Sequence, residues 1–89
     1  MKDFDFRRLL IRAQTLRETD VDCSAARSAW WRGYIRGLRR AHHGDNFGTE
    51  AEHALFMDAV NSRDESRVAL GKGYRAGLTL TASEPETGL

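Results

Sequence analysis

The chain has 89 residues, of which 40% are hydrophobic and 30% charged, and its formal net charge is +1. This length supports one small domain, and the composition is that of a folded globular protein. Its short apolar runs exclude a membrane-spanning helix. The single cysteine, Cys23, excludes an internal disulfide and cannot by itself form a cysteine-based zinc cluster. Because carboxylates stand near Met1, where a secretory signal needs positive charge, we expect a cytoplasmic protein.

The charged residues are segregated along the chain. Arginine supplies 12 of the 14 cationic residues, and its planar guanidinium suits carboxylates, phosphates and aromatic faces. A GC-rich genome would enrich arginine equally well. Residues 23–43 contain five arginines and no carboxylate, whereas residues 44–62 contain four carboxylates and neither lysine nor arginine. The two segments therefore have opposite charge.

A first helix is predicted over residues 5–18, because apolar residues recur there at helical spacing: Phe6, Leu9, Leu10, Ala13 and Leu16. Asp3 or Asp5 is expected to cap it. The alternating letters of residues 2–7 would also fit a short strand, but the helical period continues further along the chain, so we favour the helix.

The second helix, residues 24–42, has the clearest pattern. Its apolar arc contains Trp30, Trp31, Tyr34, Ile35, Leu38 and Ala41, and four arginines lie on the opposite arc. Asp22 or Ser24 is expected to cap its start, and Gly44 stands where a helix commonly ends.

Two capping boxes predict two more helices. Thr49 begins a third helix over residues 49–61, which we expect to form a hairpin with helix 24–42 across the loop of residues 42–48. Ser62 is expected to cap a fourth helix, and residues 79–89 lack periodicity and are expected to form a mobile tail.

A short repeat links the second and fourth helices. Residues 32–38 and 72–78 share the pattern basic-Gly-Tyr-x-x-Gly-Leu. Glycines four residues apart leave a shallow groove on a helix, so we expect these helices to cross near Gly37 and Gly77, with Tyr34 and Tyr74 beside the contact. The glycines would otherwise only weaken the helices.

These elements predict an all-α domain of three to four short helices covering residues 1–78. The expected core consists of Leu9, Leu10, Ala13, Leu16, Trp30, Tyr34, Leu38, Leu55, Phe56, Val60, Leu70 and Tyr74. The third helix carries carboxylates that would repel phosphates, and the loop before it is long, so a helix-turn-helix motif is set aside.

Catalytic and metal chemistry find little support in the sequence. His42, His43 and His53 flank the loop before the third helix but lack a closed ligand spacing, so we expect no metal site and no cofactor. Cys23 precedes the second helix, whose dipole would lower its pKa, yet no sequence pattern pairs it with a base. We therefore expect a protein that is not an enzyme.

The candidate binding residues lie on the second helix: Arg32, Arg36, Arg39, Arg40 and Trp31. Exposed tryptophan beside arginine is typical of protein interfaces, so we expect a non-catalytic module that binds a protein partner. Nucleic-acid phosphates bound by the same arginines are the alternative, unless Glu50, Glu52 and Asp58 already neutralise them. A homodimer through Trp31 and the glycine faces is left open. In size, arginine content and lack of catalytic motifs, the chain resembles accessory proteins of bacterial mobile elements, which include inhibitors of host proteins.

Overall fold

The computed structural model describes residues 3–19, 24–44, 49–81 and 85. These segments contain four α-helices and one short 3-10 helix, with no strand among them. The elements are α1 (Asp3–Thr19), α2 (Ala25–His43), α3 (Glu50–Asp58), the 3-10 helix η2 (Ala59–Asn61) and α4 (Glu65–Thr79). The predicted all-α fold class is confirmed.

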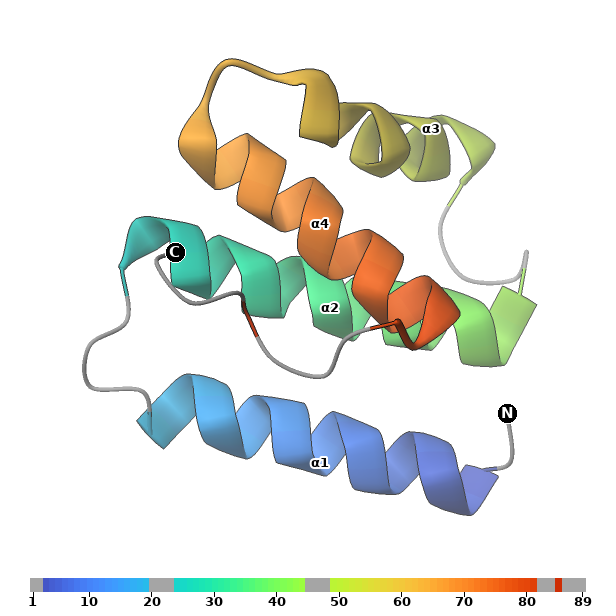
Figure 1. The fold of residues 1–89 in the computed structure, drawn as a ribbon. Coiled ribbons are helices and arrows are strands. Elements are labelled where there is room, and N and C mark those ends of the chain that lie inside the picture. The colour runs from blue at the N-terminus through green and yellow to red at the C-terminus, as the bar shows by residue number, and fades with distance from the viewer. Residues whose placement is uncertain (1–2, 20–23, 45–48, 82–84, 86–89) are drawn as a thin grey trace.

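Helix α2 lies at the centre of the fold (Figure 1). Helix α1 covers one side of α2 and runs in the opposite direction, while α4 crosses the other side and runs in the same direction as α2. Helix α3 lies beyond α4 and contacts mainly α4 and η2. None of the described helices combines the length and the apolar character needed to cross a membrane.

Side-chain caps fix three of the helix starts. The Ser24 hydroxyl accepts a hydrogen bond from the Arg27 amide at 3.1 Å, and the Thr49 hydroxyl accepts one from the Glu52 amide at 3.0 Å, as predicted. At the end of α2, Gly44 has a φ of 64° and its amide donates to the Arg40 carbonyl. The predicted caps Ser24 and Thr49 and the terminating glycine of α2 are therefore confirmed, whereas Asp3 and Asp5 do not cap α1, because the helix already includes both residues.

The fourth helix starts later than predicted. Ser62 does not cap α4, because its hydroxyl accepts a hydrogen bond from the Asp64 amide at 3.1 Å within the preceding turn. The Asp64 carboxylate instead accepts from the Ser66 amide at 3.0 Å, and α4 begins at Glu65. It ends at Thr79, which the sequence had assigned to the tail, followed by Leu80 at a φ of 57°.

The predicted glycine crossing of α2 and α4 is confirmed. A Cβ placed on Gly33 would overlap the Leu70 carbonyl oxygen, and a Cβ on Gly73 would overlap the Trp30 carbonyl oxygen. The second pair behaves in the same way, because a Cβ on Gly37 or Gly77 would overlap a tyrosine carbonyl oxygen on the facing helix. The backbones of two parallel helices thus approach so closely that only glycine fits at these positions.

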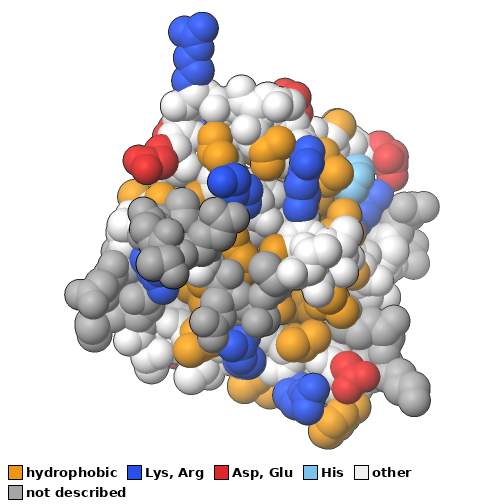
Figure 2. Space-filling model, in the orientation of Figure 1, with side chains coloured by type: hydrophobic (Ala, Val, Ile, Leu, Met, Phe, Trp, Pro, Cys, Tyr) orange, Lys and Arg blue, Asp and Glu red, His pale blue; other side chains and the backbone are white. Residues whose placement is uncertain are grey.

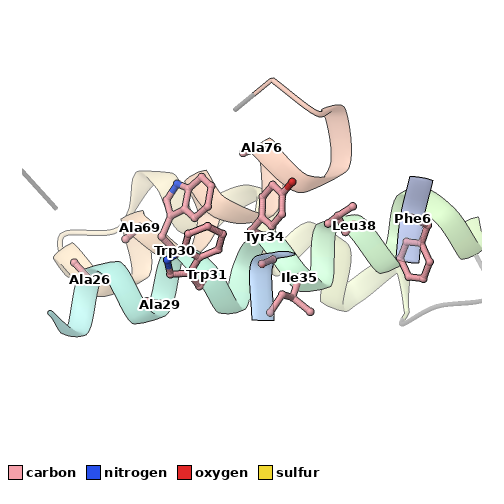
Figure 3. Packing of buried hydrophobic residues seen from close by; sticks show 11 residues of the cluster. Phe6, Ala26, Ala29, Trp30, Trp31, Tyr34, Ile35, Leu38, Ala69 and Ala76 are labelled. Atoms are coloured by element: carbon pink, nitrogen blue, oxygen red, sulfur yellow. The ribbon is translucent and has the colours of Figure 1, made fainter. Parts of the chain in front are cut away.

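The core forms around α2 (Figure 3). Trp30 and Tyr34 are stacked with their ring centroids 5.2 Å apart, and Trp31 meets Trp30 edge to face at 5.1 Å. Small residues fill the remaining space and allow the close approach of the helices: Ala13, Ala26, Ala29, Ala69 and Ala76. Phe6, Trp31 and Ile35 are buried although the predicted core omitted them.

The predicted core positions on the third helix are wrong. Helix α3 has no buried residue, Leu55 is 72% exposed, and Phe56 and Val60 are half-buried. The reason is that α4 occupies the surface of α2 on which α3 was expected to pack. The helices of the predicted hairpin do run in opposite directions (Figure 1), but α4 makes the close contact with α2.

Candidate functional site: an arginine cleft

The four candidate arginines of α2 divide into two groups. Arg36 and Arg40 reach toward α3, where Arg36 Nη2 is ion-paired with Glu52 Oε1 and Arg40 Nη2 lies 2.8 Å from Glu50 Oε1. Within the described part of the chain, Arg32 and Arg39 form no ion pair with a carboxylate. The internal neutralisation considered from the sequence therefore applies to two of the four arginines.

The two ion pairs differ in how deeply their arginines are buried. Only 9% of the Arg40 side chain is exposed, against 79% of its partner Glu50, so Arg40 is held within the fold. The Arg36 side chain is 39% exposed, and its guanidinium lies 5.8 Å from the centre of the Phe56 ring. The third expected carboxylate, Asp58, instead accepts a hydrogen bond from Asn61 at 3.2 Å.

An open cleft of about 630 Å³ lies between α1 and α2. We call it the arginine cleft, and its lining residues are Gln14, Arg17 and Glu18 from α1 with Arg32, Ile35, Arg36 and Arg39 from α2. Among the residues that the structure describes, four arginines and one glutamate line it, and one of these arginines, Arg36, is ion-paired with Glu52 of α3. Guanidinium groups at this density favour an anionic ligand, because each can donate two parallel hydrogen bonds to a carboxylate or phosphate.

Helix α1 supplies cleft residues that were not predicted from the sequence: Gln14, Arg17 and Glu18. Arg17 stands in the last turn of α1, and the antiparallel packing of α1 on α2 brings it to the arginines of α2. The sequence signal that could have identified Arg17 is the presence of several arginines on the first helix as well as on the second. Together α1 and α2 carry nine arginines and three carboxylates.

Trp31 does not belong to the exposed site. The sequence placed it on a partner-binding surface, but its side chain is 2% exposed and packs in the core. The reason is that α1 and α4 cover two sides of α2, so both adjacent tryptophans are buried. The glycine faces that a homodimer would use are also buried, since α2 and α4 pack against each other through these glycines within one chain.

Two of the three histidines, His42 and His43, pack together around Phe6, and His53 lies apart from them on α3. The His42 ring stacks on Phe6 with 4.1 Å between centroids, and the His43 ring meets Phe6 edge to face at 5.5 Å. His53 Nδ1 lies 2.7 Å from the Tyr74 hydroxyl. Among the described residues, no three histidine, cysteine or carboxylate side chains come together in a group that could hold a metal ion. Cys23 and Asp45 lie outside the described residues.

Two tyrosines have pKa values above their ordinary value of 10.0. Burial raises the pKa of Tyr34, and the positive charge of Arg12 opposes this rise. Burial also raises the pKa of Tyr74, while Arg40 opposes the rise and Glu52 adds to it. Both hydroxyls therefore stay protonated at neutral pH and act as neutral hydrogen-bonding groups.

The surface in Figure 2 shows basic side chains interspersed with hydrophobic ones, with acidic side chains near the edge of the view. Hydrophobic side chains also reach the surface along the lower edge, where α1 lies in Figure 1. Isolated exposed apolar residues are common on soluble proteins, but mixed arginine and apolar surface is typical of protein interfaces.

The chain matches no protein-family model, and comparison with curated proteins and with solved structures finds no similar protein.

Proposed function

We propose that this chain is a non-catalytic binding module that holds an acidic segment of a partner protein in the arginine cleft. The observation that carries the proposal is the convergence of Arg17, Arg32 and Arg39 on one open cleft, in which Glu18 is the one carboxylate among the described lining residues. Unlike ion pairs on an open surface, which contribute little, charges grouped in a cleft act on the same ligand. The mostly buried side chain of Ile35 also lines the cleft.

The ion pairs that Arg36 and Arg40 form with α3 favour a protein partner over nucleic acid. A nucleic-acid backbone carries regularly spaced phosphates and is best matched by a continuous row of cations. Along α2 that row is interrupted, because Glu52 and Glu50 already neutralise Arg36 and Arg40. A compact group of guanidiniums instead suits the clustered carboxylates of an acidic protein segment.

The test is an amide NMR titration of the whole chain with two probes, a short glutamate-rich peptide and a short mixed-sequence DNA or RNA. We expect the peptide to shift amides around residues 14–18 and 32–39 at low salt. These shifts should weaken at physiological salt, where screening acts over about 8 Å. No peptide-induced shift at low salt would overturn the proposal, and tighter binding of DNA or RNA would replace it with the nucleic-acid function.

Charge-reversal variants locate the binding surface. The double variant Arg32→Glu with Arg39→Glu should abolish the peptide-induced shifts. Arg63→Glu with Arg67→Glu is the matched control, because it makes the same change of charge at two exposed arginines outside the cleft. Equal loss of binding in both double variants would show a response to net charge alone and would refute a specific site.

A further inference from the structure

The outer surface of α1 carries a second feature beside the cleft. Five exposed side chains follow one another at alternating spacings of three and four residues, and we call them the α1 ridge: Phe4, Arg7, Ile11, Gln14 and Glu18. This spacing places them in one line along the helix, as in the seam of two packed helices. Phe4 is 74% exposed and Ile11 is 62% exposed.

The α1 ridge and the arginine cleft form one continuous surface. Gln14 and Glu18 belong to both, since they line the cleft and also complete the ridge. From Phe4 to Glu18 the ridge spans about 21 Å, at a rise of about 1.5 Å per residue. A ligand that fills the cleft and continues along α1 would therefore cover both large exposed apolar residues of this helix.

Extending the proposed function, on which this inference rests, we infer that the partner segment is an acidic amphipathic helix of about four turns. Such a helix packs along the α1 ridge, with apolar residues against Phe4 and Ile11. Its carboxylates face Arg7 and the arginines of the cleft. A helix satisfies its own backbone hydrogen bonds, so its side chains alone need to match this surface.

Charge complementarity selects this occupant over a second copy of the chain. The α1 ridge of a second copy carries one arginine and one glutamate, so it lacks the excess of carboxylates that the arginine cleft favours. The acidic helix α3 of another copy is a poorer match, because Glu50 and Glu52 are already engaged with Arg40 and Arg36. The occupant is therefore a helix of a different protein, with acidic residues on the side that faces the cleft.

The experiment compares two peptides of identical composition, measured by fluorescence anisotropy with the full-length chain. One carries leucines at heptad spacing with glutamates beside them, and the other has the same residues in an order without amphipathicity. We expect the amphipathic peptide to bind at least about tenfold more tightly, because only this peptide can bury apolar side chains on Ile11 and Phe4. Equal binding of the two peptides would overturn the helical occupant.

Variants separate this inference from the proposed function. Ile11→Ser and Phe4→Ser should each weaken the amphipathic peptide about tenfold and leave the other peptide unchanged. Leu55→Ser is the matched control, since Leu55 is 72% exposed on α3. If Arg32→Glu with Arg39→Glu weakens both peptides while Ile11→Ser has no effect, the arginine cleft stands and the helical occupant fails. If that double variant changes neither peptide's affinity, the proposed function fails as well.

Sedimentation of the unliganded chain tests the remaining occupant. We expect a monomer over the concentration range of the binding experiment. Concentration-dependent association that Ile11→Ser abolishes would show that the α1 ridge binds a second copy, which would overturn the inference.

Discussion

Replacing Gly37 by alanine tests the close contact between α2 and α4. A Cβ at this position would lie 2.9 Å from the Leu78 amide nitrogen and would overlap the Tyr74 carbonyl oxygen. Both atoms belong to the backbone, so α4 as a whole must move away. Overpacking of this kind costs typically 1–3 kcal/mol, and here we expect about 3 kcal/mol because no side chain can rotate to relieve the overlap. Alanine recovers about 1 kcal/mol through its higher helix propensity.

The net prediction for Gly37→Ala is a loss of about 2 kcal/mol in the free energy of unfolding, measured by urea denaturation. For a domain of this size, such a loss lowers Tm by roughly 8–16 °C. The control is Ala54→Gly at an exposed position of α3, which should cost about 1 kcal/mol and so establish the ordinary preference for alanine. If Gly37→Ala is as stable as the parent chain or more so, the helices do not approach as described.

Three further predictions address α3, α4 and the core. Leu55→Ala should change the unfolding free energy by no more than about 0.5 kcal/mol, whereas a core leucine would cost about 2–5 kcal/mol; a loss in the core range would contradict the exposed position. Asp64→Ala should cost about 1 kcal/mol in urea denaturation, more than Ser62→Ala, and the reverse order would identify Ser62 as the cap. Because burial raises the pKa of Tyr34 above 10.0, the unfolded chain loses this proton first, and stability should fall as pH rises above that value. Tyr34→Phe should make the fall shallower in denaturation at alkaline pH, and identical slopes would refute the effect.

The helices could be predicted because their signals are local. Apolar periodicity, capping side chains and terminating glycines depend only on residues within a turn or two. The sequence therefore defines most helix boundaries closely, as at Ser24, Gly44 and Thr49. The glycine repeat carried long-range information as well. Glycines at matching positions of two helices have a structural purpose only if the helices meet, and this identified the α2–α4 contact.

The core positions of α3 could not be predicted because two helices competed for one surface. The apolar residues of α3, which include Leu55 and Phe56, recur at helical spacing and would suit a core. This periodicity does not say which of two amphipathic helices packs on α2. The glycines of α4 decide this, since they permit a closer backbone approach than α3 can make. The N-cap of α4 could not be predicted either, because the side chains of both Ser62 and Asp64 are able to cap a helix.

The candidate site could be predicted only in part, because it depends on how the helices pack. The arginines of α2 are visible as a row in the sequence, but their division depends on where α3 and α1 lie. Arg36 and Arg40 form ion pairs with carboxylates of α3, whereas Arg32 and Arg39 line a cleft together with Arg17 of α1. Trp31 was misplaced because it was expected to be exposed beside the arginines of α2, whereas the core includes both tryptophans.

The parallel direction of α2 and α4 has a consequence for how the chain opens. Two parallel helices need a connection that returns the chain from the end of one to the start of the other, and α3 with η2 belongs to that return segment. Neither α3 nor η2 has a buried residue, so separating these two elements from the rest exposes less apolar surface than separating α2 from α4. Amide hydrogens of α3 should therefore exchange with solvent through local opening, while those of α2 and α4 at the glycine crossing exchange only when the whole domain unfolds.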